Sequence, residues 1–308
     1  MSIVYYSSAE RGKFWQAWLA KNAPDLEMYL WPETGDPTNV RYFVAWDLPD
    51  NLLLKFPHLE VIFSVGAGAD QFSPVHVPEG VSVVRMIEPG LINDMAAYVT
   101  FSVISLHREI PRYLQQQQQK LWLKHDAVPA SQCRVGILGL GNLGSAAARV
   151  LTQLGYQCSG WSRNQKHIAN VTSYFGDDQL AAFLAQSDIL VCLLPLTHLT
   201  RGLLNRDLFT QLPHGAGLVH AGRGQQLNHE DLLDALESGQ ISHAVIDVTD
   251  PEPLPLDHPF WTHPSLWLTP HIASETHAES SIKVLLDNIR RHEQGRPMNG
   301  LIDMNRGY

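Results

Sequence analysis

Short apolar segments alternate along the chain with longer segments that carry apolar residues at helical spacing. The short runs predict buried strands at residues 2–6, 42–46, 61–65, 134–138, 157–161, 189–194, 217–221, 244–248 and 266–269. Apolar residues three and four apart predict helices at residues 14–20, 93–107, 143–154, 178–186, 205–211, 229–238 and 274–294. This alternation predicts an α/β protein in which helices cover both faces of parallel sheets.

A polar stretch divides these elements into two strand–helix series. The five glutamines at 115–119 are expected to form a solvated helix face, and residues 122–132 are expected to form a linker. The second series starts at residue 134. The two series therefore predict two Rossmann-like units.

Composition excludes several classes of protein. Hydrophobic residues make up 44% of the chain and charged residues 17%, which excludes an intrinsically disordered protein. The net charge of −9 and the absence of a basic block argue against nucleic-acid binding and against a polybasic membrane anchor. The first residues lack the features of a signal peptide, and the apolar runs are too short to cross a bilayer. We therefore expect a cytoplasmic protein with no membrane partner.

The three cysteines give no indication of a metal or a disulfide framework. Cys133, Cys158 and Cys192 form no C-x-x-C pair, and no Cys/His cluster has metal-ligand spacing. We expect three reduced thiols and no metal site.

A glycine-rich turn follows the first strand of the second series. Gly139, Gly141 and Gly144 form a G-x-G-x-x-G motif that also contains Asn142 and Leu143. The first glycine permits a tight turn, the second lets a pyrophosphate approach the backbone, and the third lets the following helix pack against the strand. Phosphates bind readily at such a helix N-terminus. The motif favours a dinucleotide site over a glycine-rich turn for another ligand.

The end of the next strand indicates which dinucleotide is preferred. An NAD-binding unit usually carries Asp or Glu there to bind the ribose 2′-hydroxyl. In this chain Ser162 and Arg163 occupy that place, Lys166 follows, and no acidic residue is present. Arg and Ser suit a 2′-phosphate, so the sequence favours NADP(H), with NAD(H) as the alternative.

Three reactive residues follow three later strands. Arg223, Glu252 and His271 each lie in the segment after a predicted strand, and ligands of open α/β sheets gather at the carboxyl ends of strands. Arginine offers a bidentate fork to a carboxylate, and histidine can donate a proton. Glutamate paired with that histidine would favour its charged form. The set predicts reduction of a 2-keto acid, although each residue alone would also fit an ordinary structural role.

The chain resembles the D-isomer-specific 2-hydroxyacid dehydrogenase family and, within it, the bacterial glyoxylate/hydroxypyruvate reductase A group. The resemblance covers nearly the whole chain. It rests on the glycine motif and on the segments Trp161-Ser162-Arg163, Gly222-Arg223-Gly224, Asp247 through Glu252-Pro253-Leu254-Pro255, Thr269-Pro270-His271 and Arg306-Gly307-Tyr308.

The resemblance implies a split architecture with two Rossmann-like domains. An NAD(P)-binding, doubly wound parallel sheet at residues 99–276 is inserted in a flavodoxin-like substrate domain formed by residues 1–98 and 277–308. Family members are usually dimers, so the resemblance also implies a homodimer. It implies that Arg223, Glu252 and His271 are the catalytic residues.

The resemblance also assigns binding residues. Val65-Gly66-Ala67-Gly68-Ala69-Asp70 is similar to a family loop whose backbone N–H groups hold the substrate carboxylate, and Gly66, Ala67 and Gly68 are its central residues. Trp46 is similar to an aromatic residue of the substrate pocket, although a core tryptophan is an equal alternative. Ala221 and Asp247 match positions at the nicotinamide end of the cofactor.

Some positions depart from the family pattern. His220 stands where Asn is frequent, and Gly222 stands where Ala is usual; both flank Arg223. Residues 85–90 are also looser than the family pattern, which leaves the substrate more open than the reaction. We expect NADPH-dependent reduction of small 2-keto acids such as glyoxylate and hydroxypyruvate. The alternatives are a relative with another 2-keto acid substrate and a non-enzymatic dinucleotide sensor.

Overall fold

The computed structural model describes residues 1–49, 51–68, 70–72, 77 and 79–303. By its internal contacts the chain divides into two compact units. The first unit consists of Met1–Leu91 and Glu275–Tyr308, and the second of Ile92–Ser274. Each unit contains one parallel sheet, so the predicted fold class, an α/β protein with two Rossmann-like units, is confirmed. The domain boundaries at 98 and 277 stay a prediction.

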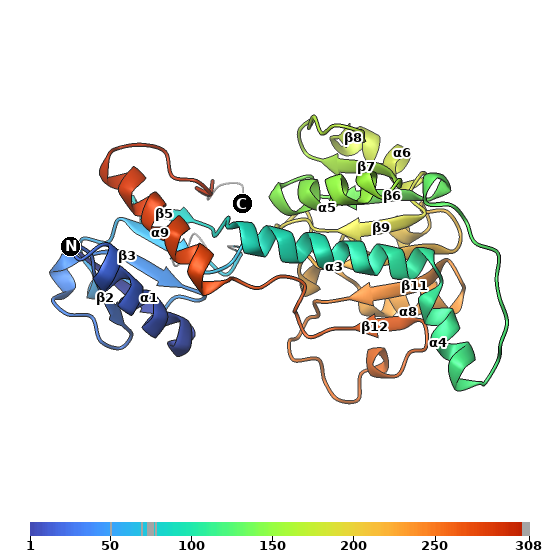
Figure 1. Ribbon diagram of the computed structural model, residues 1–308, viewed down its shortest axis with the longest axis horizontal. Helices are drawn as coiled ribbons and strands as arrows, with labels where there is room; N and C mark the ends of the chain where they lie inside the picture. Colours follow the sequence, from blue (N-terminus) through green and yellow to red (C-terminus); the bar gives the residue numbers. More distant parts are fainter. Residues whose placement is uncertain (50, 69, 73–76, 78, 304–308) are drawn as a thin grey trace. The chain divides into compact units, whose positions relative to one another are not determined.

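The first unit is built on a five-stranded parallel sheet in the order β2-β1-β3-β4-β5. Its strands are β1 (Ser2–Tyr6), β2 (Glu27–Leu30), β3 (Val40–Ala45), β4 (Val61–Ser64) and β5 (Ser82–Val84). Its helices are α1 (Ala9–Asn22), α2 (Leu52–Lys55) and α9 (Ala278–Glu293), with a 3-10 turn at Pro37–Asn39. Helices α1 and α9 lie on one face of the sheet (Figure 1). They pack around Trp15 and Leu285, whereas Phe56 lies in the core of the other face.

The second unit is built on a seven-stranded parallel sheet in the order β12-β11-β10-β9-β6-β7-β8. Its strands are β6 (Arg134–Leu138), β7 (Gln157–Ser162), β8 (Val171–Phe175), β9 (Ile189–Cys192), β10 (Ala216–His220), β11 (Ile241–Ile246) and β12 (Leu266–Leu268). The strand order reverses between β6 and β9, which is where open α/β sheets bind ligands.

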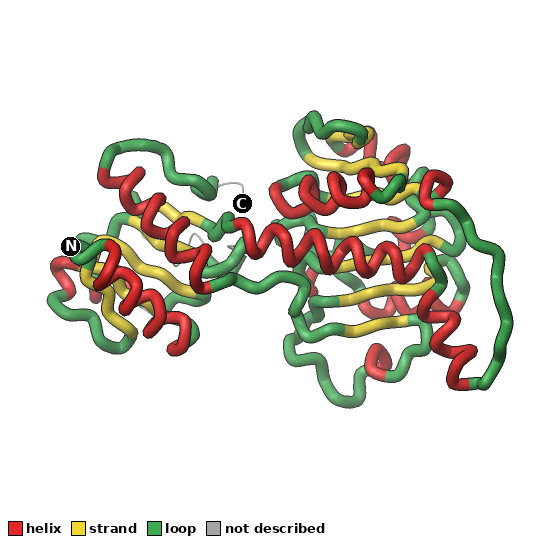
Figure 2. Tube along the Cα trace, viewed as in Figure 1, coloured by secondary structure: helices red, strands yellow, loops and turns green. Residues whose placement is uncertain are grey.

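Helices cover both faces of this larger sheet (Figure 2). They are α3 (Pro89–His107), α4 (Ile110–Gln118), α5 (Asn142–Gln153), α6 (Leu180–Leu184), α7 (Arg206–Phe209) and α8 (His229–Glu237). Val99 of α3 and Ala147 of α5 pack in the core on one face, whereas Leu184 of α6 and Leu232 of α8 pack in the core on the other. Three-residue 3-10 turns lie at Ala130–Gln132, Asp177–Gln179, Gly224–Gln226 and Pro259–Trp261.

A buried carboxylate joins two segments of the first unit. Glu88 has no exposed surface, and its side chain accepts hydrogen bonds from the backbone N–H groups of Gly90 (2.7 Å), Leu91 (2.8 Å) and His277 (3.2 Å). Glu88 therefore satisfies amides at the start of α3 and at the N-cap of α9, where helices leave N–H groups without internal partners.

Several predicted elements differ from the structure. Strands β2, β5 and β8 were not predicted. Strand β5 has only three residues, and β2 and β8 are partly exposed and lack a buried apolar run. Helix α9 begins at Ala278, four residues later than predicted. The expected solvated glutamine face is wrong at Gln116, which is buried and bonded to His125. Among the described residues, no helix is long and apolar enough to cross a membrane.

Candidate active site

The glycine motif forms the connection from β6 to α5. Gly139 has a φ of +104°, which favours glycine, and a Cβ there would lie 2.9 Å from the Leu193 carbonyl oxygen. A Cβ on Gly144 would overlap the Gly139 carbonyl oxygen. A Cβ on Gly141 would meet no atom within 4 Å, so open space adjoins the backbone at the start of α5. The turn fits the phosphates of a dinucleotide, and Asn142 and Leu143 open the helix there.

The segment after β7 is exposed. Ser162 is buried, and its hydroxyl donates to the Asn164 carbonyl oxygen at 2.8 Å, so it shapes the turn. Arg163 and Lys166 are exposed, and the Lys166 backbone N–H donates to Ser173 Oγ at 3.2 Å. A cavity of about 410 Å³ adjoins this segment, and its lining includes Gln165, Lys166, His167 and Ser173.

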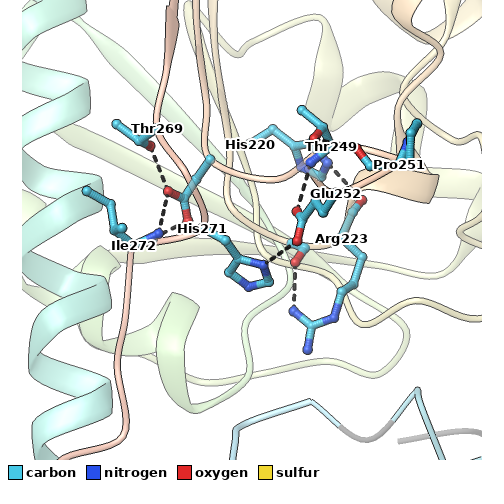
Figure 3. A network of polar contacts seen from close by, with 11 residues as sticks. His220, Arg223, Thr249, Pro251, Glu252, Thr269, His271 and Ile272 are labelled. Atoms are coloured by element: carbon cyan, nitrogen blue, oxygen red, sulfur yellow. Dashed lines mark hydrogen bonds and ion pairs between the residues drawn. The ribbon is translucent and has the colours of Figure 1, made fainter. Parts of the chain in front are cut away.

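The three reactive residues follow neighbouring strands of one sheet. Arg223 follows β10, Glu252 follows β11 and His271 follows β12. His271 Nδ1 lies 2.9 Å from Glu252 Oε2, and Glu252 Oε1 accepts from the Thr249 N–H at 3.0 Å (Figure 3). The carboxylate can only accept, so Nδ1 carries a proton. This leaves Nε2 as the ring nitrogen that is available for proton exchange with a ligand.

The loop that carries His271 is held in an unusual backbone conformation. His271 has a φ of +55°, which is uncommon for a residue with a side chain. Asp247 is 2% exposed, and its carboxylate accepts from Thr269 Oγ1 (2.6 Å) and from the N–H groups of Ile272 and Ala273 (both 2.9 Å). The His271 N–H donates to the Asp247 carbonyl oxygen at 2.9 Å. Asp247 thus braces the loop on both sides of His271.

A tyrosine of α3 extends this network. The hydroxyl oxygen of Tyr98 lies 2.6 Å from Thr269 Oγ1. Thr269 donates to the Asp247 carboxylate, so its oxygen accepts the Tyr98 proton. Burial raises the pKa of Tyr98 to about 12, which keeps the hydroxyl protonated for this bond.

Arg223 lies in a tightly bonded turn. Its backbone N–H donates to Gln226 Oε1 at 2.8 Å, and its Nη1 donates to the Gly222 carbonyl oxygen at 2.8 Å. A Cβ on Gly224 would overlap the Thr249 carbonyl group, so only glycine fits there. Ala221 is 8% exposed and directly follows β10.

The first unit contains the other predicted binding residues. Ser64 Oγ accepts from the Gly66 N–H at 3.1 Å and donates to the Gly68 carbonyl oxygen at 2.8 Å. A Cβ on Gly66 would lie 2.9 Å from the Trp46 ring, and Trp46 is 45% exposed, which excludes the alternative of a core tryptophan. Ala67 is half-buried. Ala69 and the ending Arg306-Gly307-Tyr308 lie outside the described residues.

Four residues of this geometry were not singled out from the sequence. They are Tyr98, Thr249, Thr269 and Gln226. Thr249 and Thr269 lie inside the quoted segments that contain Glu252 and His271, so they could have been found from those motifs. Tyr98 and Gln226 give no local signal, because their importance depends on a partner that the fold brings close.

Comparisons with known proteins agree with these observations. Residues 100–273 match the family model described as D-isomer specific 2-hydroxyacid dehydrogenase, NAD binding domain. The chain is 37% identical over 314 aligned positions to a glyoxylate/hydroxypyruvate reductase A from Yersinia enterocolitica, with both chains fully covered.

Two solved structures are similar over their whole length. One is a D-isomer specific 2-hydroxyacid dehydrogenase from Xanthobacter autotrophicus in complex with NADPH and MES, with a TM-score of 0.95, 36% identity and coverage of 100% of this chain and 99% of that chain. The other is an NADPH-dependent glyoxylate/hydroxypyruvate reductase from Sinorhizobium meliloti in complex with NADP and sulfate, with a TM-score of 0.92, 31% identity and full coverage of both chains.

Proposed function

The chain belongs to the D-isomer specific 2-hydroxyacid dehydrogenase family, and we propose that it reduces small 2-keto acids, such as glyoxylate and hydroxypyruvate, with NADPH. It is an NAD(P)-dependent oxidoreductase of the glyoxylate/hydroxypyruvate reductase type. The observation that carries the proposal is the His271–Glu252 pair, in which Nδ1 of the histidine lies 2.9 Å from Oε2 of the glutamate. These residues follow β12 and β11, and Arg223 follows the neighbouring strand β10.

The proposed proton transfer uses His271. The carbonyl oxygen of a 2-keto acid gains negative charge as it is reduced and needs a proton. Glu252 orients the ring through Nδ1, so that Nε2 is the atom that would donate the proton. Arg223 binds the substrate carboxylate with its guanidinium fork. When bound, the reduced nicotinamide supplies the hydride for the keto carbon.

The proposed cofactor is NADP(H), with NAD(H) as a weaker alternative. Gly139, Gly141 and Gly144, together with the first turn of α5, would hold the pyrophosphate, and open space at Gly141 supports this assignment. Arg163 would recognise the 2′-phosphate, and Ser162 would assist it if its hydroxyl turned from the Asn164 carbonyl oxygen to the phosphate. The lack of an acidic residue in this segment supports the assignment. Two similar structures contain NADPH or NADP.

Other cofactor and substrate contacts are proposed from the resemblance. Ala221 and Asp247 would adjoin the nicotinamide. Within the first unit, the loop at Gly66, Ala67 and Gly68 would bind the substrate carboxylate, and the exposed Trp46 would contact another part of the substrate. We propose that residues 1–98 and 277–308 form the substrate domain and residues 99–276 the dinucleotide domain.

We also propose that the chain is a homodimer. One continuous stretch of the second unit runs from the end of α3 through α4 to the extended connection that follows it (Figure 1). Large apolar side chains are exposed along this stretch. They are Phe101, Ile104, Ile110, Leu114, Leu121, Trp122, Leu123 and Val128. Monomers rarely expose so many in one region. A dimer mass for wild type and a monomer mass for Trp122→Glu in light scattering would support this, and a monomeric wild type would refute it.

Initial rates with four combinations of one cofactor and one 2-keto acid test the proposed reaction. NADPH and NADH oxidation would each be followed with glyoxylate and with hydroxypyruvate. Faster turnover with NADPH supports both the reaction and the cofactor. Turnover with NADH alone would overturn the roles of Ser162 and Arg163 but not the reaction. Cofactor binding without turnover on any 2-keto acid would favour the dinucleotide sensor.

A further inference from the structure

Two fully buried polar side chains contact the turn that carries Arg223. His220, the last residue of β10, and Gln226, which ends the 3-10 turn Gly224–Gln226, both have no exposed surface. Neither touches solvent, so neither can contact a ligand from the protein surface. Burial of a polar side chain is unfavourable unless its hydrogen bonds are made, so their partners indicate what these residues do.

Both side chains bind the backbone of Arg223 itself. Gln226 Oε1 accepts from the Arg223 N–H at 2.8 Å, and His220 Nε2 lies 2.9 Å from the Arg223 carbonyl oxygen. A carbonyl can only accept, so His220 must carry its proton on Nε2. Burial lowers the pKa of His220 to about 4, which keeps its ring neutral at physiological pH. The peptide groups on both sides of the Arg223 Cα are therefore fixed by side chains.

The amide of Gln226 also connects this turn to the end of β9. Gln226 Nε2 donates to the carbonyl oxygens of Leu194 (3.2 Å) and Pro195 (3.1 Å). Both polar atoms of the amide are thus engaged at once. A shift of Gln226 would break its bonds to the segment after β9 as well as its bond to Arg223, so the turn after β10 is held to the segment after β9.

The absence of a side chain at Gly222 leaves room for the Gln226 side chain. A Cβ on Gly222 would overlap Gln226 Oε1 and would lie 3.1 Å from the Leu194 carbonyl oxygen. Alanine at 222 would therefore displace the amide oxygen that holds the Arg223 N–H. This gives a physical reason for glycine at this position: the residue at 222 must leave space for the glutamine at 226.

We propose that His220 and Gln226 are positioning residues that fix the backbone of Arg223 and thereby place its guanidinium for the substrate carboxylate. This inference rests on the role of Arg223 in the proposed function. It adds that two residues that do not touch the substrate, His220 and Gln226, support Arg223. Misplacing a binding group by about 1 Å can cost about 10²-fold in rate, so loss of the pair should be visible in kinetics.

Gln226→Met is the main test, with Gln240→Met as its matched control. Gln240 also donates through Nε2 to two carbonyl oxygens, those of Phe209 (2.8 Å) and Leu212 (3.1 Å). It precedes β11 and so lies at the amino ends of the parallel strands, whereas Arg223 lies at their carboxyl ends. We expect Gln226→Met to raise KM for glyoxylate at least about tenfold and to lower kcat/KM about 10²-fold, with Kd for NADPH changed less than about twofold. Gln240→Met should lower Tm without changing the kinetics.

Two further comparisons separate positioning from general destabilisation. His220→Leu should resemble Gln226→Met, whereas His220→Asn, which retains an N–H donor, should recover part of the activity. Gly222→Ala should impair the wild type but add little to Gln226→Ala, because the two positions share one contact. Equal kinetics for Gln226→Met and Gln240→Met, or independent effects at 222 and 226, would overturn the proposal.

Hydrogen exchange distinguishes failure of this inference from failure of the proposed function. A wild type that reduces no 2-keto acid would refute the function, and exchange at the Arg223 amide would still test the pair. The amide should exchange slowly in wild type and in Gln240→Met, and at least about tenfold faster in Gln226→Met. Equal exchange in all three proteins would overturn the inference.

Discussion

The turn that carries Arg223 and the segment that follows Ser162 both end strands of the same sheet, but they are held in opposite ways. The backbone of Arg223 is bonded to fully buried side chains, and the loop of His271 is braced by the buried Asp247. After Ser162, in contrast, Arg163 and Lys166 are exposed. Groups that act on reacting atoms need placement within about 0.5 Å, whereas a solvated phosphate can be met by long, adjustable side chains.

We expect the largest loss of stability and activity when the Asp247 carboxylate, which holds the loop of His271, is removed. Asp247→Ala would leave the Thr269 hydroxyl and the N–H groups of Ile272 and Ala273 without their carboxylate acceptor, and would weaken the support for the positive φ of His271. We expect a loss of about 3 kcal/mol or more in the free energy of unfolding, together with loss of activity. Urea unfolding and initial rates would measure both. A variant as stable as wild type would contradict the bracing role.

The pH dependence of stability tests the burial of His220. Its pKa is lowered to about 4 in the folded state, mainly by burial, from an ordinary value of 6.5. Between these values the unfolded state binds more protons, so stability falls as pH decreases from 6.5 towards 4. His220→Asn should reduce this fall by about 3 kcal/mol. Urea unfolding at pH 7 and at pH 4 checks it. An equal fall in both proteins would show that His220 does not titrate as expected.

Glu252→Gln tests the carboxylate that orients His271. Both of its oxygens accept hydrogen bonds, and an amide has only one oxygen. If that oxygen stays with Thr249, the amide N–H₂ faces His271 and disfavours a proton on Nδ1. We expect kcat to fall about 10²-fold. Glu237→Gln, an exposed change on α8, is the control and should match wild type. Wild-type kcat in Glu252→Gln would contradict the pairing.

The smallest effect is expected in the exposed segment. Arg163→Ala should raise KM for NADPH about tenfold, or about 1.4 kcal/mol, and leave KM for NADH and the stability nearly unchanged. Arg149→Ala, an exposed change on α5, is the matched control. A similar rise in KM for both cofactors would indicate contact with a part that they share. No rise at all would remove Arg163 from the proposed NADP(H) site.

The same contrast explains what the sequence could predict. The α/β class, the strand ends that carry Arg223, Glu252 and His271, and the family were evident from apolar runs and short motifs. The edge strand β12 was predicted, but the edge strand β8 was missed because Val171–Phe175 has no buried face to produce such a run. Gln226 and Tyr98 were missed for a different reason. Each acts through a residue brought near by the fold, and a lone Gln or Tyr in a sequence does not identify its partner.

The central claim is that His271 donates the proton in an NADPH-dependent reduction. The most direct test is kcat/KM for glyoxylate with NADPH, measured for wild type and His271→Ala, with Kd for NADPH determined in both. We predict steady turnover in wild type and a loss of about 10² to 10⁴-fold in the variant, with NADPH affinity nearly unchanged. Turnover in His271→Ala within about twofold of wild type would contradict the claim.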